Sequence, residues 1–218
     1  MSRIDNVKAV IFDLDGTLID TEKIYSEVWP KAIETFGLKM EREQYLALRS
    51  LGRPFAPRKM KEWFGEDFDY DKARTVRKGF FDAYIAEHGI ERKYGATELL
   101  SYLRNKGIIT AIATATDVKR AGEYLEMTGL TGYFDKLISA TMVDEGKPSP
   151  KVYLYACEQL KLSPSECVAV EDAPNGIISA KRAGLKVIMV PDQSKPDAKL
   201  MAELDYCVNN LKEIMELI

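Results

Sequence analysis

Two carboxylates stand two positions apart where a short apolar segment ends. Asp13 closes the nearly continuous apolar run Val7–Asp13, Asp15 follows after one intervening residue, and Gly16 comes next. Alternation along an extended chain sends residues two apart to the same side, so these carboxylates are expected to converge while glycine lets the backbone turn behind them. An aspartate beside glycine is often an ordinary turn cap. That explanation covers one aspartate but not two on the same side of a buried strand.

Three later apolar segments also end in, or are followed by, residue types that can bind phosphate or a metal. These are Ala113-Thr114-Ala115-Thr116, Gly146-Lys147-Pro148 after the third segment, and Val170-Glu171-Asp172. The first offers hydroxyls and the backbone N–H groups that open a helix, which suits an anion. Taken singly, Thr116 also suits a helix cap, and a lone lysine is usually a surface residue. The acidic pair beside two further aspartates indicates an oxygen-liganded divalent cation, most naturally Mg²⁺.

The four segment ends together predict one site. In an open α/β sheet, ligands bind outside the carboxyl ends of the strands, so these side chains are expected in one crevice. Four carboxylates would repel one another there unless cations intervene, and Mg²⁺ with Lys147 supplies those charges. A metal, a cationic clamp, hydroxyl and amide donors, and a nucleophile with an acid/base partner match phosphoryl transfer.

The segments that carry these residues alternate with helical patterns. The apolar runs expected to be strands are Val7–Asp13, Ile108–Thr114, Lys136–Ala140, Cys167–Glu171, Lys186–Val190 and, more weakly, Tyr206–Val208. Helical patterns lie over Thr97–Lys106, Val118–Thr128, Pro150–Leu160 and Asn175–Ala183. Strand, helix and strand repeated in this way predict an α/β fold with a doubly wound parallel sheet.

A long segment interrupts this alternation after the first strand, because the next strand is expected only at Ile108. The stretch from Glu22 to about Gly89 has no clear strand but several helical patterns, and it is too long for an ordinary connection. Two apolar stripes mark its helices, Ile24, Val28, Ala32 and Phe36 in one and Val76, Phe80, Ala83 and Tyr84 in the other. We therefore expect a helical domain inserted after the first strand.

The ordered motifs resemble those of the haloacid dehalogenase superfamily of phosphotransferases, and within it the β-phosphoglucomutase-like branch of phosphatases and mutases. The family's four motifs fall on Asp13-Leu14-Asp15-Gly16-Thr17, on Thr114, on Lys147 and on Glu171-Asp172-Ala173-Pro174-Asn175-Gly176. The resemblance implies a Rossmann-like core of residues 1–19 and 90–218 and an inserted α-helical cap of residues 20–89. It covers nearly the whole chain and is weakest in the inserted helices.

The resemblance also implies a role for each motif residue. Asp13 would attack phosphorus to form an aspartyl-phosphate, and Asp15 would act as the general acid and then the general base. Thr114, Ala115 and Lys147 would hold phosphate oxygens. Mg²⁺ would be bound by Asp13, the backbone carbonyl of Asp15 and Asp172, with Glu171 a neighbour or a ligand.

The inserted segment bears on specificity. Gly52-Arg53-Pro54 resembles the family's specificity loop, so Arg53 is expected either to contact a polar or second anionic group of the substrate or to be an exposed arginine at a helix start. Lys93-Tyr94-Gly95 is expected at the returning hinge. Family mutases carry a histidine where this chain has Tyr25, and the only histidine is His88. Since tyrosine is a poor proton shuttle at neutral pH, this favours a phosphatase over a mutase.

Composition excludes several other classes. The 218 residues carry 31 Lys+Arg and 34 Asp+Glu, a net charge of -3 that gives no general attraction to nucleic acid or membrane. No apolar run is long enough to span a membrane, and the start does not resemble a signal peptide. Three scattered cysteines without Cys-x-x-Cys spacing indicate buried free thiols in a reducing cytoplasm. We predict a cytoplasmic Mg²⁺-dependent phosphatase of a small phosphorylated metabolite, with a sugar phosphate or similar polyol phosphate as the favoured substrate. No oligomer is predicted. The alternatives are a phosphomutase and, less favoured, a non-catalytic phosphate-binding module.

Overall fold

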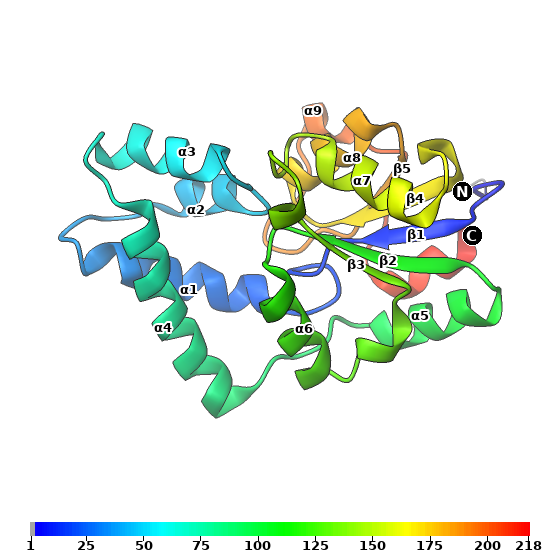
Figure 1. Cartoon of the computed structure of the whole chain (residues 1–218), viewed down its shortest axis with the longest axis horizontal. Coiled ribbons are helices and arrows are strands. Elements are labelled where there is room, and N and C mark those ends of the chain that lie inside the picture. The colour runs from blue at the N-terminus through cyan, green and yellow to red at the C-terminus, as the bar shows by residue number, and fades with distance from the viewer. Residues whose placement is uncertain (1–2) are drawn as a thin grey trace.

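A single parallel sheet forms the centre of the protein. The computed structural model describes residues 3–218. Among these residues the sheet has six strands in the order β3-β2-β1-β4-β5-β6, and each pairs in parallel with its neighbour. The strands are β1 (Ala9–Phe12), β2 (Ile109–Thr114), β3 (Lys136–Ser139), β4 (Cys167–Glu171), β5 (Lys186–Met189) and β6 (Tyr206–Cys207). The predicted doubly wound parallel sheet is confirmed, with each strand near its expected place (Figure 1).

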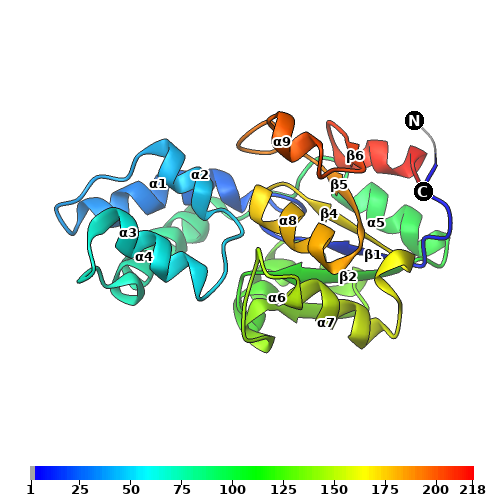
Figure 2. The same cartoon turned by 90° about the horizontal axis from the view of Figure 1, so that it is seen from above.

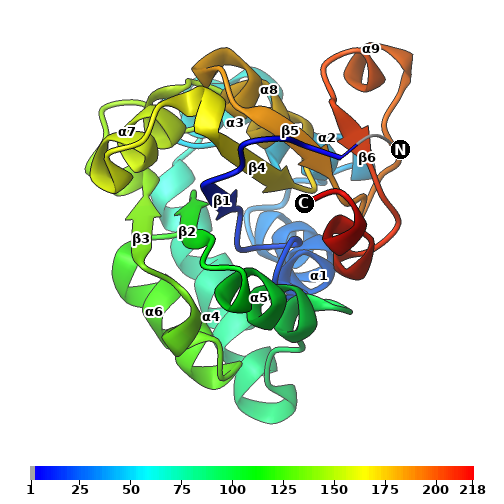
Figure 3. The same cartoon turned by 90° about the vertical axis from the view of Figure 1, so that its right-hand side faces the viewer.

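Helices cover both faces of this sheet (Figures 2 and 3). The helices of this part are α5 (Ala96–Asn105), α6 (Val118–Met127), α7 (Lys151–Leu160), α8 (Pro174–Ala183) and the short α9 (Ala198–Met201). Short 3-10 helices are η1 (Thr131–Tyr133), η2 (Ala140–Met142), η3 (Pro164–Glu166) and η4 (Leu211–Glu216). Alternate side chains of β1 point to opposite faces. Val10 and Phe12 belong to the core with α5, α6 and η4, whereas Ala9 and Ile11 belong to the core with α7 and α8.

Four helices between β1 and α5 gather beyond one end of the sheet (Figure 1). They are α1 (Thr21–Glu34), α2 (Arg42–Leu48), α3 (Phe55–Phe64) and α4 (Tyr70–His88), and we call them the inserted helices. Ile24, Val28 and Ala32 are buried, as the first apolar stripe predicts. That the inserted helices act as a cap, which would close over the site, stays a prediction.

The stripe predicted for α4 is wrong at two positions. Phe80 and Ala83 are exposed, and the fully buried residues of this helix are Ala73 and Phe81. The face of α4 that packs inward therefore differs from the predicted one. It includes Arg77, whose guanidinium stacks on two aromatic rings. A search for apolar residues alone does not find such a face.

The chain enters and leaves the inserted helices along one path. Ile19 and Arg92 form an antiparallel bridge, and the backbone N–H of Asp20 donates to the carbonyl of Glu91 at 2.8 Å. The ammonium of Lys93 lies 3.3 Å from a carboxylate oxygen of Asp20. The crossing falls close to the predicted boundaries. The division into 1–19 with 90–218 and 20–89, and the hinge at Lys93, stay predictions.

A second contact joins the inserted helices to the rest of the chain through two glycines. The N–H of Gly52 donates to the carbonyl of Lys147 at 2.8 Å, and the N–H of Gly146 donates to the carbonyl of Arg53 at 2.7 Å. A Cβ built on Gly52 would lie 2.6 Å from the Cα of Gly146, so neither residue has room for a side chain. We call this contact the Gly52–Gly146 junction.

Two remaining sequence expectations concern membranes and thiols. Within residues 3–218, no helix combines the length and the apolar character needed to cross a bilayer. Cys157 and Cys167 are buried free thiols, as predicted, whereas Cys207 is only partly buried.

Candidate active site

Asp13 lies at the centre of a buried charge cluster just beyond β1. Its backbone N–H donates to the carbonyl of Val170, which fixes it beside β4. Its Oδ1 accepts from the ammonium of Lys147 at 2.5 Å, and Lys147 also donates to Oε1 of Glu171 at 2.6 Å. The three side chains are almost completely buried. The strand ends therefore bring these predicted site residues together.

Glu171 is held by packing as well as by charge. Its Oε1 accepts from the Tyr153 hydroxyl at 2.6 Å, and α8 begins directly beneath it. A Cβ on Gly176 would lie 2.0 Å from Oε1 of Glu171, so the carboxylate occupies the space that any other residue would need. Gly176 thus lets the carboxylate rest against the start of the helix.

The Gly176→Ala variant is expected to displace Glu171 from Lys147, lowering stability by about 1–3 kcal/mol through overpacking and turnover by about 10²-fold. Chemical denaturation and phosphate-release assays measure the two effects. The matched control is Gly122→Ala in α6, where a Cβ meets nothing within 4 Å. That control is expected to gain up to about 1 kcal/mol of helix stability. Equal stabilities of the two variants would contradict the steric argument.

Asp15 is surrounded by hydroxyl groups. The hydroxyls of Thr21 and Thr116 donate to its two carboxylate oxygens at 2.6 and 2.7 Å, and the Thr114 hydroxyl lies 3.5 Å from Oδ2. The N–H of Thr116 donates back to the Thr114 hydroxyl at 3.0 Å. These donors hold the Asp15 carboxylate in place beside Asp13.

Three carboxylates form a group that fits a metal ion. Asp13, Glu171 and Asp172 each offer an oxygen atom, and these atoms lie within 4.8 Å of one another. Oδ2 of Asp13 and Oε2 of Glu171 are buried without a hydrogen-bond partner among the described residues. Unpartnered buried carboxylate oxygens are costly unless a cation binds them, so this donor set fits Mg²⁺. The carboxylate of Asp15 lies outside this group, so only its backbone carbonyl remains as its predicted contribution.

Burial shifts the ionisation of these acids. It raises the pKa of Asp13 well above its usual range, although the ammonium of Lys147 opposes the shift. Burial raises the pKa of Asp172 to about 6 and that of Glu22 to about 8, in both cases against the lowering effect of Arg49. Burial disfavours the charged form of Lys147, but the neighbouring carboxylates outweigh it and raise its pKa. Positive charge is therefore favourable at this cluster.

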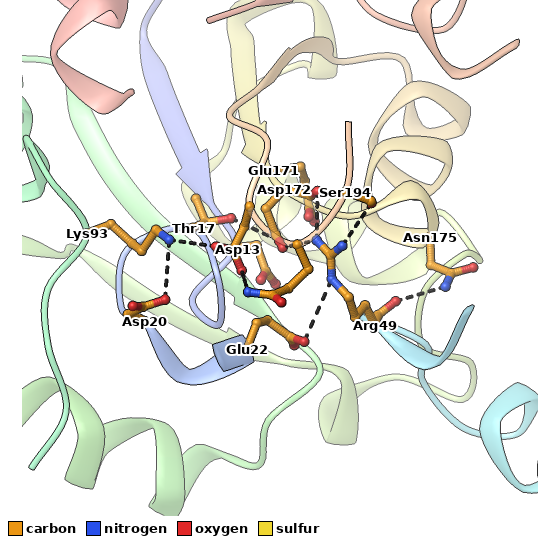
Figure 4. Close-up of polar contacts among 12 residues, drawn as sticks. Asp13, Thr17, Asp20, Glu22, Arg49, Lys93, Glu171, Asp172, Asn175 and Ser194 are labelled. Atoms are coloured by element: carbon orange, nitrogen blue, oxygen red, sulfur yellow. Dashed lines mark hydrogen bonds and ion pairs between the residues drawn. The ribbon is translucent and has the colours of Figure 1, made fainter. Parts of the chain in front are cut away.

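Sequence reasoning missed Arg49, which follows α2 and reaches into the cluster from the inserted helices (Figure 4). Its side chain is fully buried and forms an ion pair with Asp172. Its Nε lies 3.7 Å from a carboxylate oxygen of Glu22, which also accepts from the Tyr45 hydroxyl. No local pattern marks Arg49, because its main partner lies far along the chain.

A cavity of about 380 Å³ opens between the inserted helices and the sheet. Four of the predicted site residues line it, namely Asp13, Asp15, Ala115 and Arg53. Thr114 and Lys147 are fully buried and are not among the residues that line the cavity. The side chain of Arg53 is 52% exposed and pairs with Asp71, so the structure leaves both predicted readings of Arg53 open.

Three further arginines, missed in the sequence, also line the cavity: Arg74, Arg77 and Arg120. Arg120 pairs with Asp82 at 2.6 Å. Arg74 and Arg77 have no ion-pair partner among residues 3–218, and the guanidinium of Arg77 stacks on Tyr25 and Trp29 at 4.7 and 4.9 Å. Their spacing of three places them on one face of α4, a signal that an apolar search overlooks.

A parallel sheet that carries paired carboxylates and a buried lysine at its carboxyl edge has the groups that phosphoryl transfer needs. A family model described as haloacid dehalogenase-like hydrolase matches residues 7–184, and the chain belongs to this family. The family membership that the four sequence motifs predict is thus confirmed.

The relatives narrow the class to phosphoric monoester hydrolases. Hexitol phosphatase A of Escherichia coli is 32% identical over 95% of this chain and 93% of its own length. The phosphorylated carbohydrates phosphatase of Thermotoga maritima is 28% identical over 96% of this chain and 100% of its length. The crystal structure of CbbY from Rhodobacter sphaeroides in complex with phosphate matches with a TM-score of 0.78 and 26% identity, covering 95% of this chain and 96% of the other.

Proposed function

We propose that this protein is a Mg²⁺-dependent phosphatase of a small phosphorylated carbohydrate, acting through an aspartyl-phosphate on Asp13. The observation that carries the proposal is the buried Asp13–Lys147 pair beside Asp15 at the wall of a cavity. The names of the two phosphatase relatives support the choice of a carbohydrate. A cytoplasmic location stays a prediction.

The chain's own residues account for both half-reactions. A carboxylate oxygen of Asp13 attacks phosphorus while the Asp15 carboxyl gives its proton to the departing alcohol oxygen. The Asp15 carboxylate then takes a proton from water, whose oxygen attacks phosphorus and frees Asp13 with inorganic phosphate. Lys147 and the donors at Thr114 and Ala115 hold the phosphate oxygens throughout.

Asp13, Glu171 and Asp172 are the residues that would hold Mg²⁺, and the backbone carbonyl of Asp15 is the further predicted ligand. When bound, the metal would shield the anionic nucleophile from the anionic substrate and stabilise the transferring group. Lys147 contributes part of the same neutralisation, since it pairs with Asp13 and Glu171 together.

The cavity wall supports a polar leaving group. Arg74 and Arg77 offer guanidinium donors without ion-pair partners among the described residues, and Trp29 and Tyr70 add aromatic faces. Arginine forks and aromatic rings suit the hydroxyl groups and C–H faces of a sugar or polyol. We therefore favour a sugar phosphate or polyol phosphate, held by the inserted helices acting as a cap.

The geometry favours a phosphatase over a mutase. Tyr25 lines the cavity where family mutases carry histidine, and its hydroxyl lies 3.2 Å from that of Tyr124. Burial raises the pKa of Tyr25 above its usual range, which makes it a still poorer proton shuttle. His88 lies at the exposed end of α4 and is absent from the cavity lining.

The test is phosphate release from a panel of sugar and polyol phosphates, with and without Mg²⁺. We expect phosphate release with Mg²⁺ and a loss of at least about 10²-fold in EDTA, because the acidic cluster then lacks its cation. Restoring Mg²⁺ should restore the rate. A chain that isomerises a sugar phosphate without releasing phosphate would instead be a mutase, and one that only binds phosphate would be the non-catalytic module.

A further inference from the structure

Arg49 is the one arginine of the described chain whose side chain is fully buried in ion pairs, and it is supplied by the inserted helices. It follows the last residue of α2, where the chain leaves that helix. From there its guanidinium reaches Asp172, the residue directly after β4 (Figure 4). A residue of the inserted helices therefore takes part in the charge balance of the sheet's acidic cluster.

The contacts of Arg49 tie it firmly to that cluster. One terminal nitrogen donates to the backbone carbonyl of Asp172 at 2.9 Å and to the Asp172 carboxylate. The other donates to the Ser194 hydroxyl at 3.0 Å. The backbone carbonyl of Arg49 accepts from the side-chain amide of Asn175 at 2.8 Å. These contacts exist only while the inserted helices lie against the sheet.

Asp172 is also one of the three carboxylates that fit a metal ion. We infer that Arg49 and a divalent cation are alternative counter-charges for Asp172. Until a phosphate group enters the site, metal binding therefore disfavours the arrangement in which the inserted helices place Arg49 on Asp172, and that arrangement weakens metal binding. The inference rests on the proposed function for the identity of the metal site.

The physical reason is repulsion between cations in a buried site. A guanidinium and a divalent ion on one carboxylate repel each other strongly where water does not screen them. Moving the inserted helices away removes Arg49 and relieves this repulsion. A phosphate group brings negative charge to the same place, so Arg49 and the cation are then tolerated together. By linkage, whatever favours the metal disfavours the Arg49 contact to the same extent.

Arg49 therefore does more than pack the inserted helices against the sheet. The site is expected to shut over metal and phosphate together rather than over the metal alone. Shutting over the metal alone would exclude substrate, so Arg49 is a positioning residue that makes closure depend on substrate.

The first test is Mg²⁺ binding by calorimetry without substrate. Arg49→Met, which keeps the length and loses the charge, is expected to bind Mg²⁺ about tenfold more tightly than the natural chain. Arg49→Lys, which keeps the charge, is expected to stay within about threefold. The matched control is Arg42→Met. Arg42 is the first residue of α2 and donates to the backbone carbonyl of Gln193, the residue before Ser194. Its side chain is exposed and contacts no carboxylate of the cluster. Unchanged or weaker Mg²⁺ binding in a folded Arg49→Met would overturn the inference.

The second test uses the unaltered chain and so does not depend on a variant that folds. Small-angle X-ray scattering should show a larger radius of gyration when Mg²⁺ alone is added, and a return when inorganic phosphate follows. No expansion with Mg²⁺, or no return with phosphate, would overturn the inference. Both readouts are equilibrium measurements without turnover. They can therefore fail while phosphate release is intact, whereas failure of the proposed function would appear as no phosphate release from any ester.

Discussion

Asp13→Asn is expected to abolish phosphate release, with a loss of at least about 10⁴-fold in kcat. The amide keeps the shape of the carboxylate but cannot form the aspartyl-phosphate. The unpartnered Oδ2 of Asp13 shows that the carboxylate is not consumed by structural hydrogen bonds. Release of phosphate from a sugar phosphate and from 4-nitrophenyl phosphate, each with Mg²⁺, measures the effect.

The fold should survive this change, because Lys147 keeps its 2.6 Å contact with Glu171. Thermal unfolding of the variant therefore serves as the control, and a second control is Asp5→Asn, which alters an exposed aspartate outside the site. If folded Asp13→Asn retained more than about one per cent of the natural rate, the nucleophile would have to be another residue.

Asp15→Asn is expected to lower kcat for a sugar phosphate by about 10²–10⁴-fold, the range typical for loss of a general acid or base. The amide can still bond to the hydroxyls of Thr21 and Thr116, so the backbone and the neighbouring residues should hold their places. What the variant lacks is a group that gives a proton to the leaving alcohol and later takes one from water.

The choice of leaving group separates these two tasks. With 4-nitrophenyl phosphate the departing oxygen needs no proton, so Asp13 should still be phosphorylated and a rapid burst of nitrophenolate should appear. Turnover should then stall, because the second step needs the base. Rapid-mixing absorbance measures the burst. Equal losses for both substrates without a burst would show that Asp15 acts only by orienting other groups.

Much of the sheet could be predicted from the sequence, because each parallel strand buried on both faces is a short, nearly continuous apolar run. Three short apolar runs end at Asp13, Thr114 and Glu171, and a fourth, Lys136–Ala140, is followed by Lys147. Since the carboxyl ends of parallel strands share one edge, a strand assignment also places the side chains that follow it. The order of the motifs then identified the family, which the comparison with known proteins confirms.

The inserted helices were predicted less well, because their inner face depends on partners rather than on a local period. Arg77 lies inward over Tyr25 and Trp29, so the buried side of α4 includes a cation and the apolar residue Phe80 is left outside. Arg49 was missed for a related reason. Its partner Asp172 is separated from it by 123 positions, and nothing near Arg49 in the chain signals that contact.

The Gly52–Gly146 junction also constrains how the sequence can change over evolutionary time. A side chain at either glycine would push apart the two backbones and break both hydrogen bonds between them. Once they are apart, a side chain at the other glycine costs little more, so the effects of the two substitutions do not add. The two positions are therefore expected to change together rather than independently. A lineage that loses one glycine loses the constraint on the other, and the first substitution is the step that selection must tolerate.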